Sequence, residues 1–189
     1  MTKKKAVFLD KDGTLITDVP YNADPAFMAL SSHCVAGLHH LQEKGYLLVV
    51  VSNQAGVARG YFSETALIAV EQRLKEMLAG TGIILNGFYY CPHHPDGMVK
   101  SLTINCDCRK PAPGLLFKAA EELDIDLSTS WMIGDILNDI EAGNRAGCRS
   151  ILIDNGNETE WYLNEIRNPV LKARTINEAA DHILKTDVK

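Results

Sequence analysis

The sequence predicts an α/β fold, a doubly wound parallel sheet with helices on both faces. Short, predominantly apolar runs alternate along the chain with segments of helical periodicity. Polar residues follow several of the apolar runs directly, which is typical of strands that end at a binding edge. No internal repeat or linker-like stretch divides the chain. We therefore expect residues 1–189 to form one domain.

Five segments are predicted as strands. Lys5–Asp10 and Tyr46–Ser52 are apolar and nearly unbroken, as strands buried on both faces of a parallel sheet are. Shorter runs of the same kind lie at Gly87–Tyr90, Ser130–Gly134 and Arg149–Ile153. Because helical patterns separate these runs, parallel rather than hairpin connections are expected.

The segments between the strands carry helix signals. Val35, Leu38 and Leu41 have roughly helical spacing before Gly45, a residue type that commonly ends helices. Further helices are predicted from Ser63 to Gly80, from Pro113 to Leu123, from Leu137 to Ala146 and from Asn177 to Leu184. Residues 91–113 do not fit the alternation, and a loop of this length is commonly functional.

Composition excludes several classes of protein. The chain has 46% hydrophobic and 23% charged residues, which are ordinary globular values. Its net charge of −5 argues against a nucleic-acid partner, because phosphate backbones require a basic surface. No apolar run approaches the roughly 20 residues of a membrane span, and the N-terminal apolar run is too short for a signal peptide. We expect a cytoplasmic protein without membrane contact.

Polar residues at four predicted strand ends suit one reaction, the transfer of a phosphoryl group. They are Asp10-Lys11-Asp12-Gly13-Thr14, Ser52-Asn53-Gln54, Arg109-Lys110-Pro111 in the loop before the Pro113 helix, and Gly134-Asp135, with Asp139 further on. One carboxylate can attack phosphorus, and a second can protonate the leaving oxygen. Grouped carboxylates beside a phosphate require a hard cation such as Mg²⁺. Lys110 and Ser52 would bind the phosphate, and Gly13 allows the backbone to approach it closely.

These four ordered motifs resemble those of the haloacid dehalogenase superfamily of phosphatases, over residues 5 to 155. The resemblance implies that Asp10 is the nucleophile and Asp12 the general acid/base. It also implies that Asp10, the backbone carbonyl of Asp12 and Asp135 bind Mg²⁺. Two roles remain open for Asp139, which either orients Lys110 or caps its helix.

Four further residues have the spacing of a metal site. Cys91 and His93 form one pair, Cys106 and Cys108 form another, and residues 94–105 suffice to fold both pairs around one Zn²⁺. Four protein ligands leave no open position, so the zinc would be structural. His94 competes with His93 for the fourth position, and only the resemblance described next favours His93.

The segments Cys91-Pro92-His93-His94-Pro95 and Cys106-Asp107-Cys108-Arg109-Lys110-Pro111 are similar to those of the D-glycero-D-manno-heptose 1,7-bisphosphate 7-phosphatases, whose zinc loop histidinol-phosphate phosphatases share. The stretches Asp18-Val19-Pro20-Tyr21 and Asn53-Gln54-Ala55-Gly56, with Arg59, match substrate-contacting stretches of that family. The sequence differs from the residues common in that family at Lys11, Ser52 and Ala55. These differences affect the expected identity of the sugar substrate more than the expected catalysis.

The resemblance implies Mg²⁺-dependent hydrolysis of the 7-phosphate through an aspartyl-phosphate, within the synthesis of lipopolysaccharide precursors. Alternatives are histidinol phosphate, a nucleic-acid 3′-phosphate, and a non-catalytic zinc-stabilised binding module. Because no domain-sized insertion covers the site, it should be open, and Arg109 would bind a second anionic group or pack on the zinc loop. We expect a monomer whose partner is a small sugar phosphate.

Overall fold

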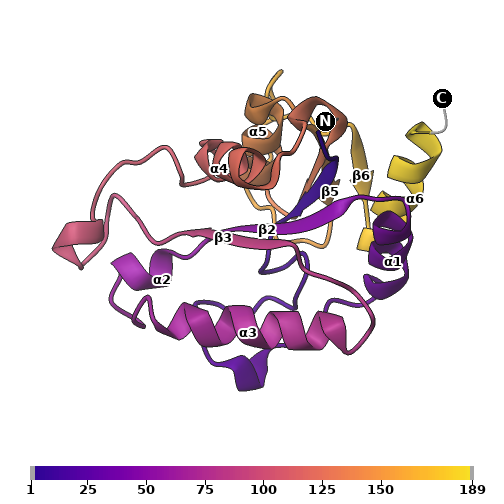
Figure 1. The fold of residues 1–189 in the computed structure, drawn as a ribbon. Coiled ribbons are helices and arrows are strands. Elements are labelled where there is room, and N and C mark those ends of the chain that lie inside the picture. Colours follow the sequence, from indigo (N-terminus) through magenta and orange to yellow (C-terminus); the bar gives the residue numbers. More distant parts are fainter. Residues whose placement is uncertain (1–2, 188–189) are drawn as a thin grey trace.

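The computed structural model describes residues 3–187, which contain a six-stranded parallel sheet (Figure 1). The strands are β1 (Ala6–Leu9), β2 (Leu47–Asn53), β3 (Gly87–Cys91), β4 (Trp131–Gly134), β5 (Arg149–Ile153) and β6 (Leu171–Ala173). They lie in the order β3-β2-β1-β4-β5-β6, and every neighbouring pair is parallel. The predicted doubly wound fold is confirmed.

The register of the central strands brings three strand ends together. Leu9 of β1 pairs with Val50 of β2 on one side and with Ile133 of β4 on the other. The residues that follow these positions therefore lie at one edge of the sheet. The strand order reverses at β1, and such a switch point is where doubly wound sheets bind their ligands.

Helices cover both faces of the sheet (Figure 1). On one face lie α1 (Val35–Glu43), α3 (Ala66–Ala79) and α6 (Ile176–Thr186), and on the other α4 (Gly114–Leu123) and α5 (Leu137–Ala146). Alternation along β1 divides the core accordingly. Val7 and Leu9 are buried on the α1 side, and Ala6 and Phe8 on the α4 side.

Two elements were not predicted. The strand β6 has only three residues and Lys172 at its centre is exposed, so no apolar run marks it. The helix α2 (Ala55–Ala58) is a single turn directly after β2. Three short 3₁₀ segments also occur, at Pro25–Phe27, Lys100–Leu102 and Leu127–Thr129. Within residues 3–187, no helix has the length and apolar character that crossing a membrane requires.

The predicted long loop between β3 and α4 packs over α2 (Figure 1). The backbone N–H groups of Met98 and Val99 donate to the carbonyl of Ala58, at 2.7 and 2.8 Å. At Gly97 an added Cβ would lie 2.9 Å from that same carbonyl, so the close approach requires glycine. The loop is thus fixed against the end of α2.

Candidate active site and metal centre

Three buried carboxylates meet where β1 and β4 end. Asp10 follows β1, Asp135 follows β4, and Asp139 lies in the first turn of α5, with one oxygen of each within 4.8 Å of the others. Burial raises the pKa of Asp10 to about 7, against the lowering effect of Lys110. Burial and the charge of Asp10 raise the pKa of Asp135 to about 6.

Lys110 is buried between two of these carboxylates. Its Nζ lies 2.5 Å from Asp10 Oδ1 and 2.7 Å from Asp139 Oδ1, and it donates to the carbonyl of Val51 at 2.9 Å. Burial alone would lower the pKa of Lys110, but the two carboxylates raise it above its usual value. The Asn53 side chain both accepts from the Lys110 N–H and donates to its carbonyl, each at 3.0 Å. Lys110 is therefore a fixed ammonium group.

Asp139 makes both of the contacts that the sequence left open. One oxygen pairs with Lys110, and the other accepts from the backbone N–H of Ile136 at 3.2 Å, which caps α5. An added Cβ at Gly134 would clash with the Asp139 side chain. The glycine before Asp135 thus makes room for the residue that pairs with Lys110.

Both oxygens of Asp12 are also occupied. Lys11, whose side chain is only 1% exposed, places its Nζ 2.5 Å from Asp12 Oδ1. Gln54 donates to Asp12 Oδ2 at 3.1 Å and to the Ser52 hydroxyl at 2.8 Å. These contacts hold the Asp12 carboxylate beside β2.

Eight of the predicted site residues line one cavity of about 250 Å³. Its lining includes Asp10, Asp12, Asp18, Ser52, Asn53, Lys110, Asp135 and Asp139. Burial and the charge of Asp12 raise the pKa of Asp18. Five of the predicted phosphate- or substrate-binding residues lie outside this lining: Gly13, Tyr21, Gln54, Arg59 and Arg109.

Two residues that the sequence reasoning missed, Asn155 and Asn157, support this cavity together with Thr14 of the first motif. Asn157 donates to Asp135 Oδ2 at 2.7 Å, and Thr14 donates to the other oxygen at 3.1 Å. Asn155 donates to the carbonyl of Gly13 at 2.6 Å. Gly13 has a φ of +77°, and a Cβ there would clash with Asp135. The polar turn after β5 therefore orients the carboxylate of β4.

The donor set fits a hard divalent cation. Asp10 and Asp135 bring two carboxylates into a buried space, and Asp139 beside them is paired with Lys110. Oxygen ligands with excess negative charge are those that Mg²⁺ prefers. When no cation is bound, Asp10 and Asp135 bind protons instead, as their raised pKa values indicate.

Stability should therefore depend on pH and Mg²⁺ together. Above a pH of about 4 the unfolded chain has released the protons that folded Asp10 and Asp135 keep until about pH 6 to 7. The folded state binds more protons in this window, so the free energy of unfolding falls as pH rises. With chelator present, we expect the Tm to fall by several degrees between about pH 5 and 8, and Mg²⁺ to restore it.

Thermal unfolding at each pH, with and without Mg²⁺, checks this expectation. Asp135→Asn removes one titrating group and one cation ligand, so its Tm should depend less on both variables. An unchanged wild-type Tm on adding Mg²⁺ at about pH 8 would contradict the cation assignment.

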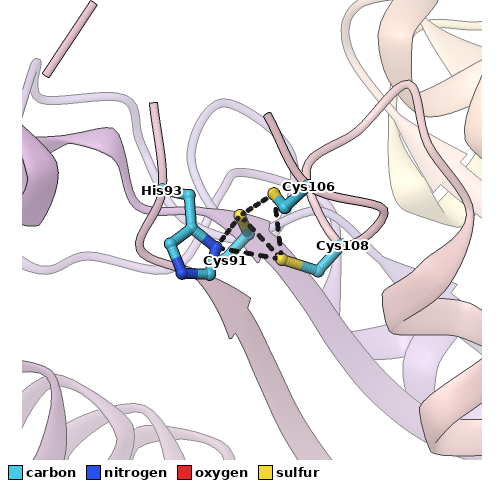
Figure 2. Close-up of side chains that lie close together, drawn as sticks. All are labelled: Cys91, His93, Cys106 and Cys108. Carbon is cyan, nitrogen blue, oxygen red and sulfur yellow. Dashed lines mark hydrogen bonds between the residues drawn. The ribbon is translucent and has the colours of Figure 1, made fainter. Parts of the chain in front are cut away.

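A second cluster holds Cys91, His93, Cys106 and Cys108, which come from two segments of the chain (Figure 2). The Cys108 sulfur lies 3.1 Å from that of Cys91 and 3.2 Å from that of Cys106. The Nδ1 atom of His93 lies 3.3 Å from the Cys108 sulfur. Tetrahedral Zn²⁺ has bonds of about 2.0–2.3 Å to nitrogen and sulfur, which places its ligands roughly 3.5 Å apart. The four atoms fit one structural zinc ion.

This cluster fixes the segment that carries Arg109 and Lys110. Cys108 immediately precedes them, and the Asp107 carbonyl accepts from Gly114 at the start of α4 at 2.9 Å. Arg109 donates to the carbonyl of His93 at 3.4 Å. His94, the rival zinc ligand, instead lies near Arg59, whose guanidinium lies over the Tyr21 ring, 5.8 Å from its centroid.

Comparisons with known proteins agree with this geometry. Residues 107–181 match the HAD-hydrolase-like family model. A D-glycero-beta-D-manno-heptose-1,7-bisphosphate 7-phosphatase of Pasteurella multocida is 44% identical over 150 residues, 79% of this chain and 81% of that protein. The protein of the same name from Yersinia pestis is 36% identical over 180 residues, 89% and 96% of the two chains.

A solved structure shows the same fold. The D,D-heptose 1.7-bisphosphate phosphatase of B. bronchiseptica, complexed with magnesium and phosphate, has a TM-score of 0.78 and 26% identity. The match covers 96% of this chain and 99% of that one. The chain therefore belongs to the haloacid dehalogenase-like phosphatases, in the family of the heptose-1,7-bisphosphate 7-phosphatases.

Proposed function

We propose that this protein is a Mg²⁺-dependent phosphatase that hydrolyses the 7-phosphate of D-glycero-D-manno-heptose 1,7-bisphosphate. One observation carries the proposal. Residues of all four motifs meet in a single cavity, where Lys110 joins Asp10 to Asp139 and Asp12 accepts a hydrogen bond from Gln54. The two relatives above carry the name of this activity.

In the first half of the reaction, an oxygen of Asp10 attacks the phosphorus of the 7-phosphate. The bond from phosphorus to the sugar oxygen breaks as the bond to Asp10 forms, and Asp12 gives its proton to the leaving oxygen. Lys110 and the Ser52 hydroxyl bind the oxygens of the phosphoryl group. Mg²⁺ held by Asp10, the Asp12 carbonyl and Asp135 would neutralise charge on those oxygens.

In the second half, Asp12 acts as a base. Its carboxylate takes a proton from water, and the water oxygen attacks the phosphorus of the aspartyl-phosphate. The bond to Asp10 breaks, so phosphate leaves and both aspartates return to their starting states. Asn157 and Thr14 keep Asp135 oriented throughout, because they donate to both of its oxygens.

A substrate panel tests the assignment directly. Purified protein with Mg²⁺ is offered heptose 1,7-bisphosphate in both anomers, histidinol phosphate and a 3′-phosphorylated oligonucleotide, and phosphate release is measured. We expect the highest kcat/KM with a heptose bisphosphate, and phosphorus NMR should identify heptose 1-phosphate as the product. Faster hydrolysis of histidinol phosphate would replace this proposal with the alternative substrate.

Arg109 is proposed to bind the phosphate that is not transferred. Lys110 beside it lies against Asp10 at the transferred phosphate, whereas Arg109 has no carboxylate within 4 Å among residues 3–187. Arg109→Ala should weaken kcat/KM for the bisphosphate by about 1.5–3 kcal/mol, the scale of a charged hydrogen bond. Heptose 7-phosphate lacks the second phosphate, so the ratio of the two kcat/KM values should fall toward one.

Parallel kinetics on both substrates check this expectation. Equal losses on the two substrates would place Arg109 in the machinery of phosphate transfer instead.

The proposal also takes residues 1–189 as one domain active as a monomer, since every side chain invoked belongs to one chain. Size-exclusion chromatography of the active protein tests that part.

A further inference from the structure

Gln54 contacts two reacting groups at once, although it does not line the catalytic cavity. Its Nε2 atom lies 2.8 Å from the Ser52 hydroxyl oxygen and 3.1 Å from Asp12 Oδ2. Both hydrogens of the amide nitrogen are therefore used. The sequence predicted that Gln54 binds the substrate, but the residue is only 5% exposed and lies outside the cavity lining. Gln54 must therefore act on the reaction through the side chains that it contacts.

The chemistry of the two partners determines which way the Gln54 amide faces. An ionised carboxylate and an amide oxygen both only accept hydrogen bonds, so a reversed amide would bring two acceptors together at Asp12. The amide nitrogen therefore faces Asp12 Oδ2. Its second hydrogen is then directed at the Ser52 hydroxyl oxygen.

This contact determines where the Ser52 hydroxyl directs its own hydrogen. The oxygen accepts from Gln54, so the O–H bond points away from the amide nitrogen. Ser52 is buried, lines the cavity and donates no hydrogen bond to another group within residues 3–187. Its O–H is therefore a free donor for an oxygen of the transferred phosphoryl group.

The same amide holds the Asp12 carboxylate for its two proton transfers. Lys11 Nζ lies 2.5 Å from Asp12 Oδ1, and Gln54 donates to Oδ2 on the other side. A carboxyl oxygen still accepts through a lone pair when it carries a proton, so the contact with Gln54 persists in both halves of the reaction. Small displacements of a reacting group are costly, and this contact prevents them.

The backbone fixes the point from which the Gln54 side chain extends. Its N–H donates to the carbonyl of Cys91 at 2.8 Å, and its carbonyl accepts from Val57 at 3.2 Å at the start of α2. Cys91 ends β3, pairs with Asn53 of β2 and belongs to the zinc cluster. Gln54 therefore extends from a rigid part of the sheet edge.

We propose that Gln54 is a positioning residue for phosphoryl transfer, which directs the Ser52 hydroxyl hydrogen at the transferred phosphoryl group and holds the Asp12 carboxylate in place. The inference rests on the proposed function for the reaction alone, because it concerns the transferred phosphate and not the sugar. It replaces the expectation that Gln54 binds the substrate itself.

The test measures kcat and KM for heptose 1,7-bisphosphate with Mg²⁺ in wild type, Gln54→Met, Gln54→Glu and Gln72→Met. Methionine has a similar length and an ionised glutamate has nearly the same shape, but neither can donate a hydrogen bond. Gln72 is exposed on α3, so Gln72→Met is the matched control and should retain the wild-type values.

Both Gln54 variants should have a kcat that is lower by about 10- to 100-fold, the scale of losing a hydrogen bond to a charged group. KM should change much less, because Gln54 makes no contact with the substrate. Thermal unfolding checks that each variant is folded. Gln54→Glu, which preserves the packing, decides the result if Gln54→Met does not fold.

Double variants separate positioning from support of the fold. When Gln54→Met is combined with Ser52→Ala or with Asp12→Asn, one of its two partners is already lost. Each double variant should therefore lose less kcat than the product of the two single losses. Fully multiplicative losses in both combinations would overturn the inference, because Gln54 would then act independently of Ser52 and Asp12.

Two further outcomes would overturn the inference and leave the proposed function intact. A higher KM at unchanged kcat would show that Gln54 binds the substrate directly, and unchanged kinetics would show that the reaction does not need it. Faster hydrolysis of histidinol phosphate by the wild type would instead defeat the proposed function. The same variants measured on that substrate would then decide the role of Gln54.

Discussion

Asp10→Asn is expected to reduce turnover of any phosphomonoester by more than about 10⁴-fold, the scale of losing a covalent nucleophile. The amide has nearly the same shape but cannot attack phosphorus, so no aspartyl-phosphate forms. The variant should still fold, because removing one of three crowded carboxylates relieves their mutual repulsion. Steady-state phosphate release and thermal unfolding measure the two effects.

Asp12→Asn is the comparison that separates the two roles. Loss of a general acid and base typically costs about 10²–10⁴-fold, so this variant should retain more activity than Asp10→Asn. It should also accumulate phosphorylated protein at Asp10, because the second half of the reaction requires a base. Mass spectrometry of the trapped protein detects this adduct. Activity of a few per cent or more in Asp10→Asn would contradict covalent catalysis.

The sequence predicted the sheet and its binding edge because strong local signals coincide there. Buried parallel strands such as β2 are continuous apolar runs, and the polar residues that end them stand out. The rule that parallel strand ends share one edge then brings Asp10 and Asp135 together without coordinates. The strand β6 carries no such signal, since it pairs at the edge of the sheet and exposes Lys172.

The residues that position the catalytic side chains were harder to predict from the sequence. Asn155 and Asn157 lie in a polar turn after β5, so the strand-end rule applied to that strand would have indicated them. The double contact of Asp139 depends on the angle at which α5 leaves β4, which residue spacing does not encode. The positions of Arg59 and His94 depend on how the zinc loop folds back on α2, a long-range contact.

Cys108→Ser is expected to lose zinc and at least about 100-fold in kcat/KM, although it is not part of the phosphate cavity. A hydroxyl is a poor zinc ligand, and three remaining ligands do not close a structural site. Cys108 immediately precedes Arg109 and Lys110, so loss of the metal releases the segment that places Lys110 at Asp10. Misplacement of such a group by about 1 Å costs on the order of 100-fold.

Cys148→Ser is the matched control, since Cys148 is another free thiol, which is buried and lies outside the zinc cluster. Metal analysis should find about one zinc per chain in wild type and Cys148→Ser, and less in Cys108→Ser. The sheet should persist in Cys108→Ser, because the core packed on β1 and β4 does not include the loop between His93 and Cys106. Far-ultraviolet circular dichroism should therefore change little while activity falls. Full activity in zinc-free Cys108→Ser would show that the Asn53 side chain holds Lys110 without help from the metal.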